Sequence, residues 1–429
     1  MSLTLTDMFC GAGGSSTGAI MNPGIEVKLA LNHWQRAIDT HQHNHPDADH
    51  ACADVQHIDP RYTPKTDLLW ASPECTNHSN AKGKKRPSND ALLFTDGLPD
   101  EAAERSRATM WDVPRFAEQH NYQAIMTENV VEAGKWGPFP AWLYAMETLG
   151  YEHHQVYMNS MHAQAFGKGA PQSRDRMYVI FWKKGNPRPD FNKLRPYAEC
   201  AKHGRVQAIQ AFKGQQWGKY RTQYHWRCPR TECRNAILEP AVEAAATAID
   251  WTLTGKRIGD RAKPLAEKTL GRIVDGLNKY PAANNLLITY YGKSTPATAD
   301  QPYSTFTTRD RHALIVPLRR NGKAKPALTM PYDTFAAGGN HHSLVEYDSP
   351  EVTDALMRMI QPHEQSWGMA FPREYQILGT MKERTMQAGN AVTPRQQGTW
   401  LESSPSRWRW RGEIIDPSFW HGPPRLAWQ

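Results

Sequence analysis

Short apolar runs alternate with helix-like stretches over the first 184 residues. Strand patterns cover residues 3–9, 27–31 and 67–70, another ends near Asp54, and the first leads into a glycine-rich turn that opens a helix. Further along, WDVPRFAEQH and PAWLYAMETLGY are typical of helices, whereas QAIMTENV and RMYVIFWKK are typical of buried strands. Strands that alternate with helices form parallel, doubly wound sheets. The pattern therefore predicts an α/β domain over residues 1–184.

The pattern changes after Lys184. Residues 185–348 are rich in Pro, Gly, Arg and Lys and carry little periodicity, which predicts a second, smaller, irregular β-rich domain. Within it QPYSTFTTRDRHALIV and MPYDTFAAGGNHHSLVEY share a Pro-Tyr, a Thr-Phe, a histidine and an apolar ending. We expect a short internal duplication that forms paired β elements.

Helical and turn patterns return over residues 349–400, which are expected to complete the first domain. The last stretch, residues 401–429, is atypical. Its tryptophans show no helical period and prolines interrupt it, so we expect a poorly ordered tail.

Composition sets the outer bounds of the class. A chain of 429 residues is long enough for two or three domains, each with its own core. Hydrophobic residues make up 39%, the mean hydropathy is -0.68, and no run approaches the roughly 20 apolar residues that cross a bilayer. The start, MSLTLTDMFCGAGG, has neither a basic segment nor a cleavable apolar one. We therefore expect a cytoplasmic protein without a membrane partner.

Charge and cysteine content add two further constraints. Lys and Arg number 51 against 43 Asp and Glu, which gives a net charge of +8 and a pI near 9.1. This excess suits a polyanionic partner, although many basic proteins bind none. The six cysteines are scattered along the chain in a way that does not suggest a disulfide framework.

The glycine-rich segment DMFCGAGGSSTG is the first candidate for chemistry. Gly11, Gly13 and Gly14 let the backbone approach a ligand closely, but a tight structural turn explains them equally well. Asp54 ends the third strand pattern and could reach the polar edge of a nucleoside. A lone aspartate at such a place is more often a helix cap.

Three further candidates follow or precede strands. Cys75 stands in ASPECTNHS at a strand exit, before the basic KGKKRPSND, where it is either a reactive thiol or an inert buried one. Glu128 in TENV follows another strand, and PQSRDR places Arg174 and Arg176 just before a strand. Each feature alone is unremarkable in an α/β protein.

Taken in order, DMFCGAGG, ADV, SPEC, TENV, PQSRDR and GNAVTP resemble the motifs of the cytosine-C5 DNA methyltransferases of bacterial or phage type. The resemblance covers roughly residues 3–182 and 356–394. It implies a Rossmann-like, S-adenosylmethionine-dependent fold and makes residues 185–348 the target-recognition domain. The cofactor-binding residues that it implies are Phe9, Gly11, Gly13, Gly14, His33, Asp54, Val55, Asn390 and Val392.

The resemblance also implies a reaction. A thiolate from Cys75 adds to cytosine C6, Glu128 donates a proton to N3, and Arg176 holds O2 while Arg174 braces the site. C5 then takes a methyl group from S-adenosylmethionine. Because C6 is inaccessible in a stacked duplex, the base is flipped out of duplex DNA. The expected protein is a monomer in a bacterial or phage-infected cell, with a cognate restriction enzyme as a possible partner.

Two departures from the family pattern keep alternatives open. Glu74 separates Pro73 from Cys75, and His33 replaces the glutamate that binds the cofactor ribose in the family. One alternative is a non-catalytic DNA-binding regulator with a degenerate methyltransferase domain. The other is an RNA cytosine-5 methyltransferase on the same scaffold.

The expected recognition domain contains two closely spaced pairs of metal-ligand residues. Cys200 and His203 are separated by two residues, and Cys228 and Cys233 by four. Three thiolates and one imidazole suit a tetrahedral structural zinc, so the spacing predicts a zinc ribbon over about residues 197–240. The alternative is that the cysteines are reduced and unpaired and that the histidine is a surface residue.

Base contacts are expected from polar and basic residues of the duplicated segments. The candidates are Arg309, Arg311, His312, His341 and His342. Arginine in particular reads guanine through paired hydrogen bonds. An equally good interpretation is that these residues only satisfy the paired β elements.

Overall fold

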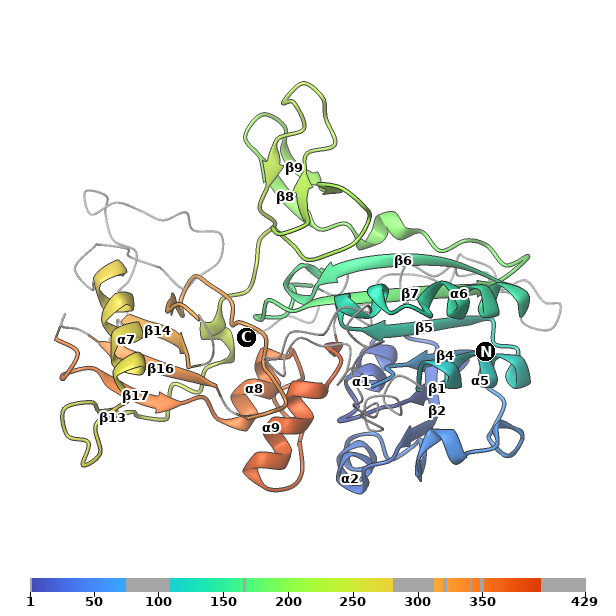
Figure 1. Ribbon diagram of the computed structural model, residues 1–429, viewed down its shortest axis with the longest axis horizontal. Coiled ribbons are helices and arrows are strands. Elements are labelled where there is room, and N and C mark those ends of the chain that lie inside the picture. The colour runs from blue at the N-terminus through green and yellow to red at the C-terminus, as the bar shows by residue number, and fades with distance from the viewer. Residues whose placement is uncertain are drawn as a thin grey trace, which may run out of the picture. The chain divides into compact units, whose positions relative to one another are not determined.

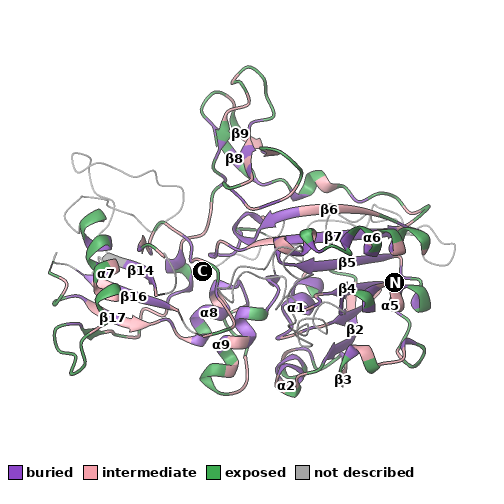
Figure 2. Cartoon of the chain, in the orientation of Figure 1, coloured by how far each residue is buried: buried purple, intermediate pink, exposed green. Residues whose placement is uncertain are grey.

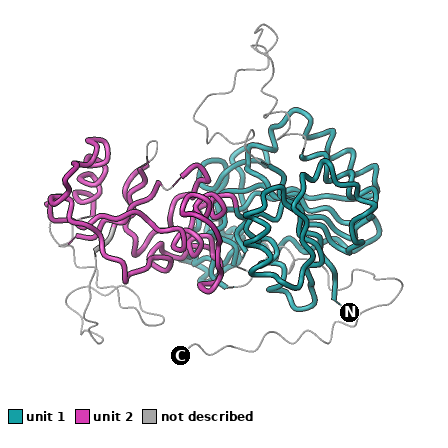
Figure 3. The backbone as a smooth tube through the Cα atoms, turned by 90° about the horizontal axis from the view of Figure 1, so that it is seen from below, with its two compact units in different colours: residues 1–169, 175–241, 391–429 teal, residues 170–174, 242–390 magenta. Residues whose placement is uncertain are grey.

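The computed structural model describes residues 2–74, 109–164, 167–280, 312–318, 322–339, 341–347 and 351–394. The chain divides into two compact units (Figure 3). Unit 1 comprises residues 1–169, 175–241 and 391–429, and unit 2 comprises residues 170–174 and 242–390. The expected recognition domain thus has residues in both units, and its assignment stays a prediction. Cys75, Arg309, Arg311 and the expected tail, residues 401–429, lie outside the described residues.

A seven-stranded sheet organises unit 1 (Figure 1). In spatial order its strands are β3 (Asp49–Cys52), β2 (Ile25–Asn32), β1 (Leu3–Met8), β4 (Leu68–Ala71), β5 (Ala124–Asn129), β7 (Asp175–Lys183) and β6 (Tyr151–Asn159). The first five strands are parallel, and β7 runs antiparallel to both of its neighbours. In its described part this unit has the helices α1 (Gly14–Ile20), α2 (Gln35–Asn44), α5 (Asp112–His120) and α6 (Phe139–Thr148). The α/β class expected from the sequence is confirmed.

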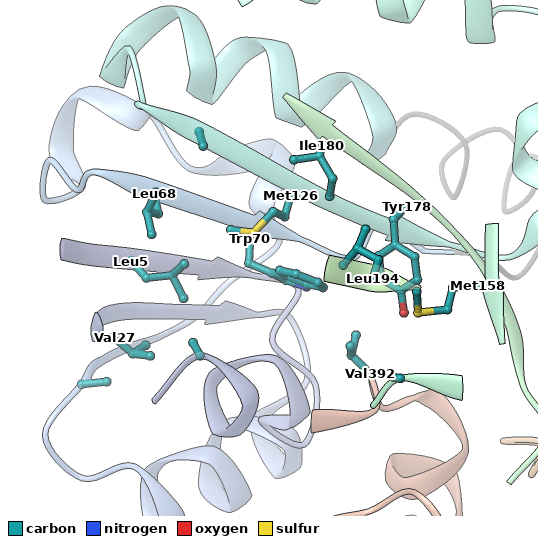
Figure 4. Packing of buried hydrophobic residues seen from close by; sticks show 14 residues of the cluster. Leu5, Val27, Leu68, Trp70, Met126, Met158, Tyr178, Ile180, Leu194 and Val392 are labelled. Atoms are coloured by element: carbon teal, nitrogen blue, oxygen red, sulfur yellow. The ribbon is translucent and has the colours of Figure 1, made fainter. Parts of the chain in front are cut away.

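The central strands are buried on both faces, as parallel strands covered by helices are. Every residue of β4 and β5 is buried, and Figure 2 shows the middle of the sheet in the buried colour. Leu5, Trp70 and Tyr178 pack in one apolar cluster (Figure 4). Val392, from the GNAVTP segment, belongs to the same cluster, so the chain returns to this core after residue 390.

Unit 1 also contains a small β-rich lobe, residues 197–239. Its hairpin pairs β8 (Tyr197–Cys200) with β9 (Gly204–Gln207). A three-stranded sheet then joins β10 (Ile209–Phe212), β11 (Tyr224–Arg227) and β12 (Ile237–Leu238). Tyr224 and Trp226 of β11 are buried and give the lobe an aromatic core.

Unit 2 is built on a five-stranded sheet. In spatial order its strands are β13 (Lys256–Arg257), β17 (Leu356–Met359), β16 (His342–Tyr347), β14 (His312–Pro317) and β15 (Lys325–Pro326). The unit also has the helices α7 (Glu267–Lys279), α8 (Pro362–Gly368) and α9 (Met381–Asn390). β14 and β16 are neighbours in antiparallel pairing, which confirms that the duplicated segments form paired β elements.

One residue of this sheet corrects a sequence expectation. His342 is 4% exposed and its ring packs against those of Tyr332 and Phe335. Burial lowers its pKa to about 4, so the ring is neutral near pH 7. His342 is therefore part of the core of unit 2, and it does not contact bases.

None of the helices in the described part of the chain has the length and apolar content needed to cross a bilayer.

Candidate functional site

The motif residues of unit 1 gather at one edge of its sheet. Since β1 to β5 are parallel, their carboxyl ends meet there, and the antiparallel β7 begins at the same edge. In open α/β sheets this edge is where ligands bind. The glycine-rich loop follows β1, His33 follows β2, Asp54 follows β3, and Glu128 stands near the end of β5.

The loop after β1 has the backbone that its glycines predict. Phe9, Gly11 and Gly13 have φ angles of 63°, 53° and 84°, and the N–H of Gly13 donates to the carbonyl of Cys10 at 2.9 Å. An added β-carbon on Gly11 would find its nearest heavy atom 4.0 Å away, at the Phe9 carbonyl. The space in front of Gly11 is therefore open to a ligand.

A buried polar network, not predicted from the sequence, supports this loop. Ser15 and Ser16 donate hydrogen bonds to the Asp7 carboxylate at 2.5 and 2.6 Å. Burial raises the pKa of Asp7 to about 6, against the lowering effect of the two hydroxyls. His41 Nε2 lies 2.9 Å from the Ser16 hydroxyl, and His41 Nδ1 lies 2.8 Å from His50 Nε2.

A second histidine extends the network on the same helix. His45 Nε2 lies 3.0 Å from the hydroxyl of Thr17, which donates to the Gly13 carbonyl at 2.8 Å. Burial lowers the pKa of His45 to about 4, and it also lowers the pKa of His41 well below its usual range. These histidines lie four residues apart, His41 on α2 and His45 at its C-terminal cap, and this spacing is the signal from which one face of a helix could have been inferred.

The ends of β2 and β3 hold the residues expected at the cofactor ribose and base. Asp54 Oδ1 accepts the N–H of Gln56 at 3.1 Å and caps the short helix η1 (Val55–His57), while its side chain stays 52% exposed. The capping interpretation is thus correct, and exposure leaves the carboxylate accessible. Val55 is buried, and His33 Nδ1 lies 3.7 Å from a carboxylate oxygen of Glu74.

Two of the expected catalytic residues, Glu128 and Arg176, form an ion pair. Glu128 Oε1 lies 2.7 Å from Arg176 Nε, and both side chains are nearly buried, at 11% and 12% exposure. Arg176 Nη1 also donates to the carbonyl of Asp175 at 2.8 Å. Next to Glu128, the side-chain amide of Asn129 donates to the carbonyl of Pro73 at 3.3 Å, which ties the exit of β5 to the segment before Cys75.

Arg174 has a different environment from Arg176. It is 3% exposed and belongs to unit 2, where its guanidinium donates to the carbonyls of Phe335 and Gly389 at 3.3 and 3.1 Å. Through these hydrogen bonds Arg174 supports the main chain at two places, one of them in the GNAVTP segment. In the same segment Asn390 ends α9 and is exposed.

The four expected metal ligands come together in the lobe. One ligand atom from each of Cys200, His203, Cys228 and Cys233 lies within 4.8 Å of the others. His203 Nδ1 is 3.5 Å from Cys200 Sγ and 3.4 Å from Cys228 Sγ. Tetrahedral zinc with bonds of about 2.3 Å would place sulfur atoms about 3.8 Å apart, so the cluster is of the right size.

The chemistry of this cluster also fits a metal. The backbone N–H of Lys202 lowers the pKa of the Cys200 thiol to about 6, which favours the thiolate. His203 Nε2 lies 3.8 Å from a carboxylate oxygen of Glu232. A carboxylate on the far nitrogen is the usual support of a metal-bound imidazole, and Glu232 was not predicted from the sequence.

Comparison with known proteins identifies the class of this fold and site. The model of the family described as C-5 cytosine-specific DNA methylase matches residues 3–397. The chain belongs to this family, and it is a DNA cytosine methyltransferase.

Curated relatives agree with this assignment. The type II methyltransferase M.HgiDI of Herpetosiphon aurantiacus is 27% identical over 275 residues, which cover 61% of this chain and 79% of the relative. The type II methyltransferase M.SsoII of Shigella sonnei is 25% identical over 181 residues, which cover 42% of each chain.

Among solved structures, the Dnmt2 methyltransferase of S. pombe matches with a TM-score of 0.52 and 14% identity, covering 94% of this chain and 97% of that chain. A mutant DNMT2 of Spodoptera frugiperda matches with a TM-score of 0.51 and 12% identity, covering 94% and 99%. These matches support the fold.

Proposed function

We propose that this enzyme transfers a methyl group from S-adenosylmethionine to C5 of a cytosine flipped out of duplex DNA, through a covalent adduct with Cys75. The observation that carries the proposal is the Glu128–Arg176 pair, 2.7 Å apart and nearly buried at the carboxyl edge of the sheet. A carboxyl group and a guanidinium that converge there match the N3 and O2 atoms of one cytosine edge.

The cofactor site follows from the loops at the same edge. The open space at Gly11, the left-handed backbone of Gly13, the half-exposed Asp54 and the buried Val55 suit an adenosyl group, with Phe9 beside it. His33 stands where the family has a ribose-binding glutamate. S-adenosylmethionine, when bound, supplies an electrophilic methyl group.

The chain's own residues then have separate tasks. The Cys75 thiolate adds to C6, and the electron pair displaced from the C5–C6 bond makes C5 nucleophilic as N3 takes a proton from Glu128. Arg176 holds O2 and stabilises the negative charge that develops on the ring. After C5 has been methylated, C5 and N3 each lose a proton. The C5–C6 double bond then forms again as the Cys75 thiolate leaves C6. Glu128 must leave its pair with Arg176, at least in part, to donate this proton.

Duplex DNA is the substrate that we propose, with the relatives named type II methyltransferases in support of a role in restriction–modification. The excess of basic residues suits the phosphate backbone. A monomer is sufficient for this chemistry, because both members of the Glu128–Arg176 pair come from one chain.

Trapping of the covalent adduct tests the function. Duplex DNA with 5-fluorocytosine at the target should form an adduct with the wild type in the presence of S-adenosylmethionine, since fluorine cannot leave as a proton does. Cys75→Ser should form none and should bind S-adenosylmethionine normally, because a hydroxyl is a far weaker nucleophile at neutral pH. An adduct formed equally well by Cys75→Ser would contradict the assignment. Methylation of tRNA without methylation of DNA would favour the RNA enzyme.

We propose in addition that Cys200, His203, Cys228 and Cys233 hold one structural zinc. The fit of four ligand atoms within 4.8 Å supports this, as does the Glu232 carboxylate near His203. A bound metal would give the lobe stability that its small core does not supply.

Elemental analysis tests the zinc site. The purified protein should contain about one zinc per chain, the stoichiometry of a four-ligand structural site. Cys228→Ser should lose the metal and keep S-adenosylmethionine binding. The control, Cys52→Ser, changes an exposed cysteine outside the cluster and should keep the metal. Fully active wild-type protein without any bound metal would refute the site.

A further inference from the structure

One turn of the lobe, Trp217–Tyr220, contacts the segment that follows Glu128. The indole N–H of Trp217 donates to the carbonyl of Val131 at 3.0 Å, and Lys219 Nζ lies 2.6 Å from a carboxylate oxygen of Glu132. Both acceptors belong to the short helix η5 (Val131–Lys135), which begins three residues after Glu128. In return, Lys135 Nζ lies 3.6 Å above the indole ring of Trp217.

The same turn also contacts the segment that carries Arg176. The backbone N–H of Tyr220 donates to Asp175 Oδ1 at 3.0 Å. Asp175 directly precedes Arg176, and its carbonyl accepts a hydrogen bond from Arg176 Nη1 at 2.8 Å. A turn of four residues thus holds the neighbours of both members of the Glu128–Arg176 pair.

The turn is itself tightly fixed. Gly218 has a φ of 130°, and a β-carbon on it would lie 2.3 Å from the side chain of Gln223, so other residues do not fit. Gln223 accepts the N–H of Lys219 through its side chain at 2.8 Å, and its own N–H donates to the Lys219 carbonyl at 2.9 Å. The geometry of the turn therefore depends on the chain that follows it.

That chain leads directly to the metal cluster. Strand β11 begins after Gln223 and ends next to Cys228, one of the four ligands. Along the strand, the indole N–H of Trp226 donates to His162 Nδ1 at 3.0 Å. Burial lowers the pKa of His162 to about 3, so the ring is neutral and one of its nitrogens can accept this bond. The proposed metal would fix one end of β11, and the turn Trp217–Tyr220 lies before the other.

We propose that the turn Trp217–Tyr220 is a positioning element for methyl transfer. The main positioning residues are Lys219 of the turn and Asp175, which accepts the N–H of Tyr220. The inference rests on the proposed function, because it concerns the orientation of Glu128 and Arg176 in that reaction. Misplacement of a reacting group by about 1 Å costs on the order of 100-fold in rate. A turn that holds the residues next to Glu128 and Arg176 therefore affects the rate. The metal-held lobe thereby supports catalysis as well as its own fold.

Lys219→Met is the variant that tests the turn, because it keeps the aliphatic stem and removes the bond to Glu132. The matched control is Arg221→Met, two residues further on, which also removes one positive charge. It breaks a pair of similar length, the 2.8 Å contact of Arg221 with Glu239, which lies within the lobe. We expect Lys219→Met to lower kcat about tenfold or more, with little change in the KM for S-adenosylmethionine or in the melting temperature. Arg221→Met should keep kcat within about twofold.

Asp175 provides an independent arm. Asp175→Ala removes the acceptor of the Tyr220 N–H and should lower kcat, whereas Asp175→Asn keeps an acceptor oxygen and should restore most of it. Hydrogen exchange of residues 129–137 should accelerate in Lys219→Met and stay unchanged in Arg221→Met. This measurement needs no turnover, so it tests the turn even if the wild type fails to methylate DNA. Equal kcat and equal exchange in the two methionine variants would overturn the inference.

Discussion

Glu128 has two roles that conflict at the scale of the single residue. In the structure it is paired with Arg176 at 2.7 Å, so one of its carboxyl oxygens is engaged by the guanidinium. The proposed reaction asks the same group to deliver a proton to N3. The substrate base therefore has to separate the pair by placing its N3 and O2 edge between the two side chains, which makes Glu128 important mainly in the transition state.

Glu128→Gln should accordingly lower kcat by about 10²- to 10⁴-fold, the usual contribution of a general acid. The glutamine side chain can still accept from Arg176, so the DNA dissociation constant should change by less than about threefold. Single-turnover methylation and an equilibrium DNA-binding titration measure the two quantities. A loss of affinity that matches the loss of rate would make Glu128 a DNA-contact residue.

His45 gives a residue-scale prediction about stability. Burial lowers its pKa to about 4, below the ordinary value of 6.5, so the folded state favours the neutral ring. At pH values between these two, the His45 ring is protonated in the unfolded chain and neutral in the folded chain. The contribution of His45 to the free energy of unfolding is therefore fully present above pH 6.5. It is lost as the pH falls from 6.5 towards 4, by up to about 1.4 kcal/mol per pH unit.

His45→Gln removes this titration while keeping a polar group for Thr17. From pH 6.5 to pH 5, the free energy of unfolding of the variant should fall by about 2 kcal/mol less than that of the wild type, as measured by urea unfolding. Asp7, whose pKa burial raises to about 6, contributes with the opposite sign, but it titrates in both proteins and cancels in the difference. Parallel pH curves for the two proteins would disprove the prediction.

At the scale of elements, the sequence predicted those strands whose residues are uniformly apolar. β4 and β5 are buried along their whole length, so their runs stand out from their surroundings. β6 (Tyr151–Asn159) was not predicted, since Glu152 to Gln155 are polar, with Glu152 exposed and the other three only partly buried. A strand near the margin of a sheet packs on fewer neighbours and therefore carries a weaker pattern.

Helix α7 was missed for a different reason. Ile273 and Leu277 lie four residues apart and bury one face, but the helix stands in a segment whose prolines, glycines and lysines suggested irregular structure. Composition over a long window concealed a local period of 3.6 residues. The paired strands β14 and β16 were predicted because their two segments repeat the same order of residues.

The sequence indicates which residues belong to the candidate site, but not which contacts join them. The motif resemblance assigned Glu128 and Arg176 to one site, yet only the antiparallel pairing of β5 with β7 brings residues 48 positions apart to 2.7 Å. The cluster of Cys200, His203, Cys228 and Cys233 could be predicted from spacing alone, because each pair is local. A buried polar residue such as Asp7 carries no period of its own, so packing alone reveals its partners.

At the scale of the whole molecule, positive charge is unevenly distributed along the chain. Residues 186–241 hold eleven Lys and Arg against four Asp and Glu. The whole chain has 51 Lys and Arg and 43 Asp and Glu. The rest of the chain therefore has 40 basic and 39 acidic residues, which is close to balance. The net charge that would attract DNA is therefore concentrated in and beside the lobe.

Arg205 and Arg230 are suitable probes of this charge. Both are exposed residues of the lobe, and neither guanidinium contacts the Glu128–Arg176 pair. Arg205 lies 4.4 Å above the ring of Tyr197 on the lobe surface. Lys65 is an exposed control on the same unit, and it precedes β4, so it lies at the opposite edge of the sheet from the motif residues.

The double variant Arg205→Gln/Arg230→Gln should weaken DNA binding and reduce its dependence on salt. Each lost phosphate contact lowers the slope of log K against log [salt] by about 0.9, so two lost contacts should lower it by about 1.8. The loss of affinity should be similar for target and unrelated duplexes, because phosphate contacts carry no sequence information. Lys65→Gln should leave the slope unchanged, and zinc content should be equal in all three proteins. If the double variant instead loses discrimination at one base pair with an unaltered slope, these arginines read bases.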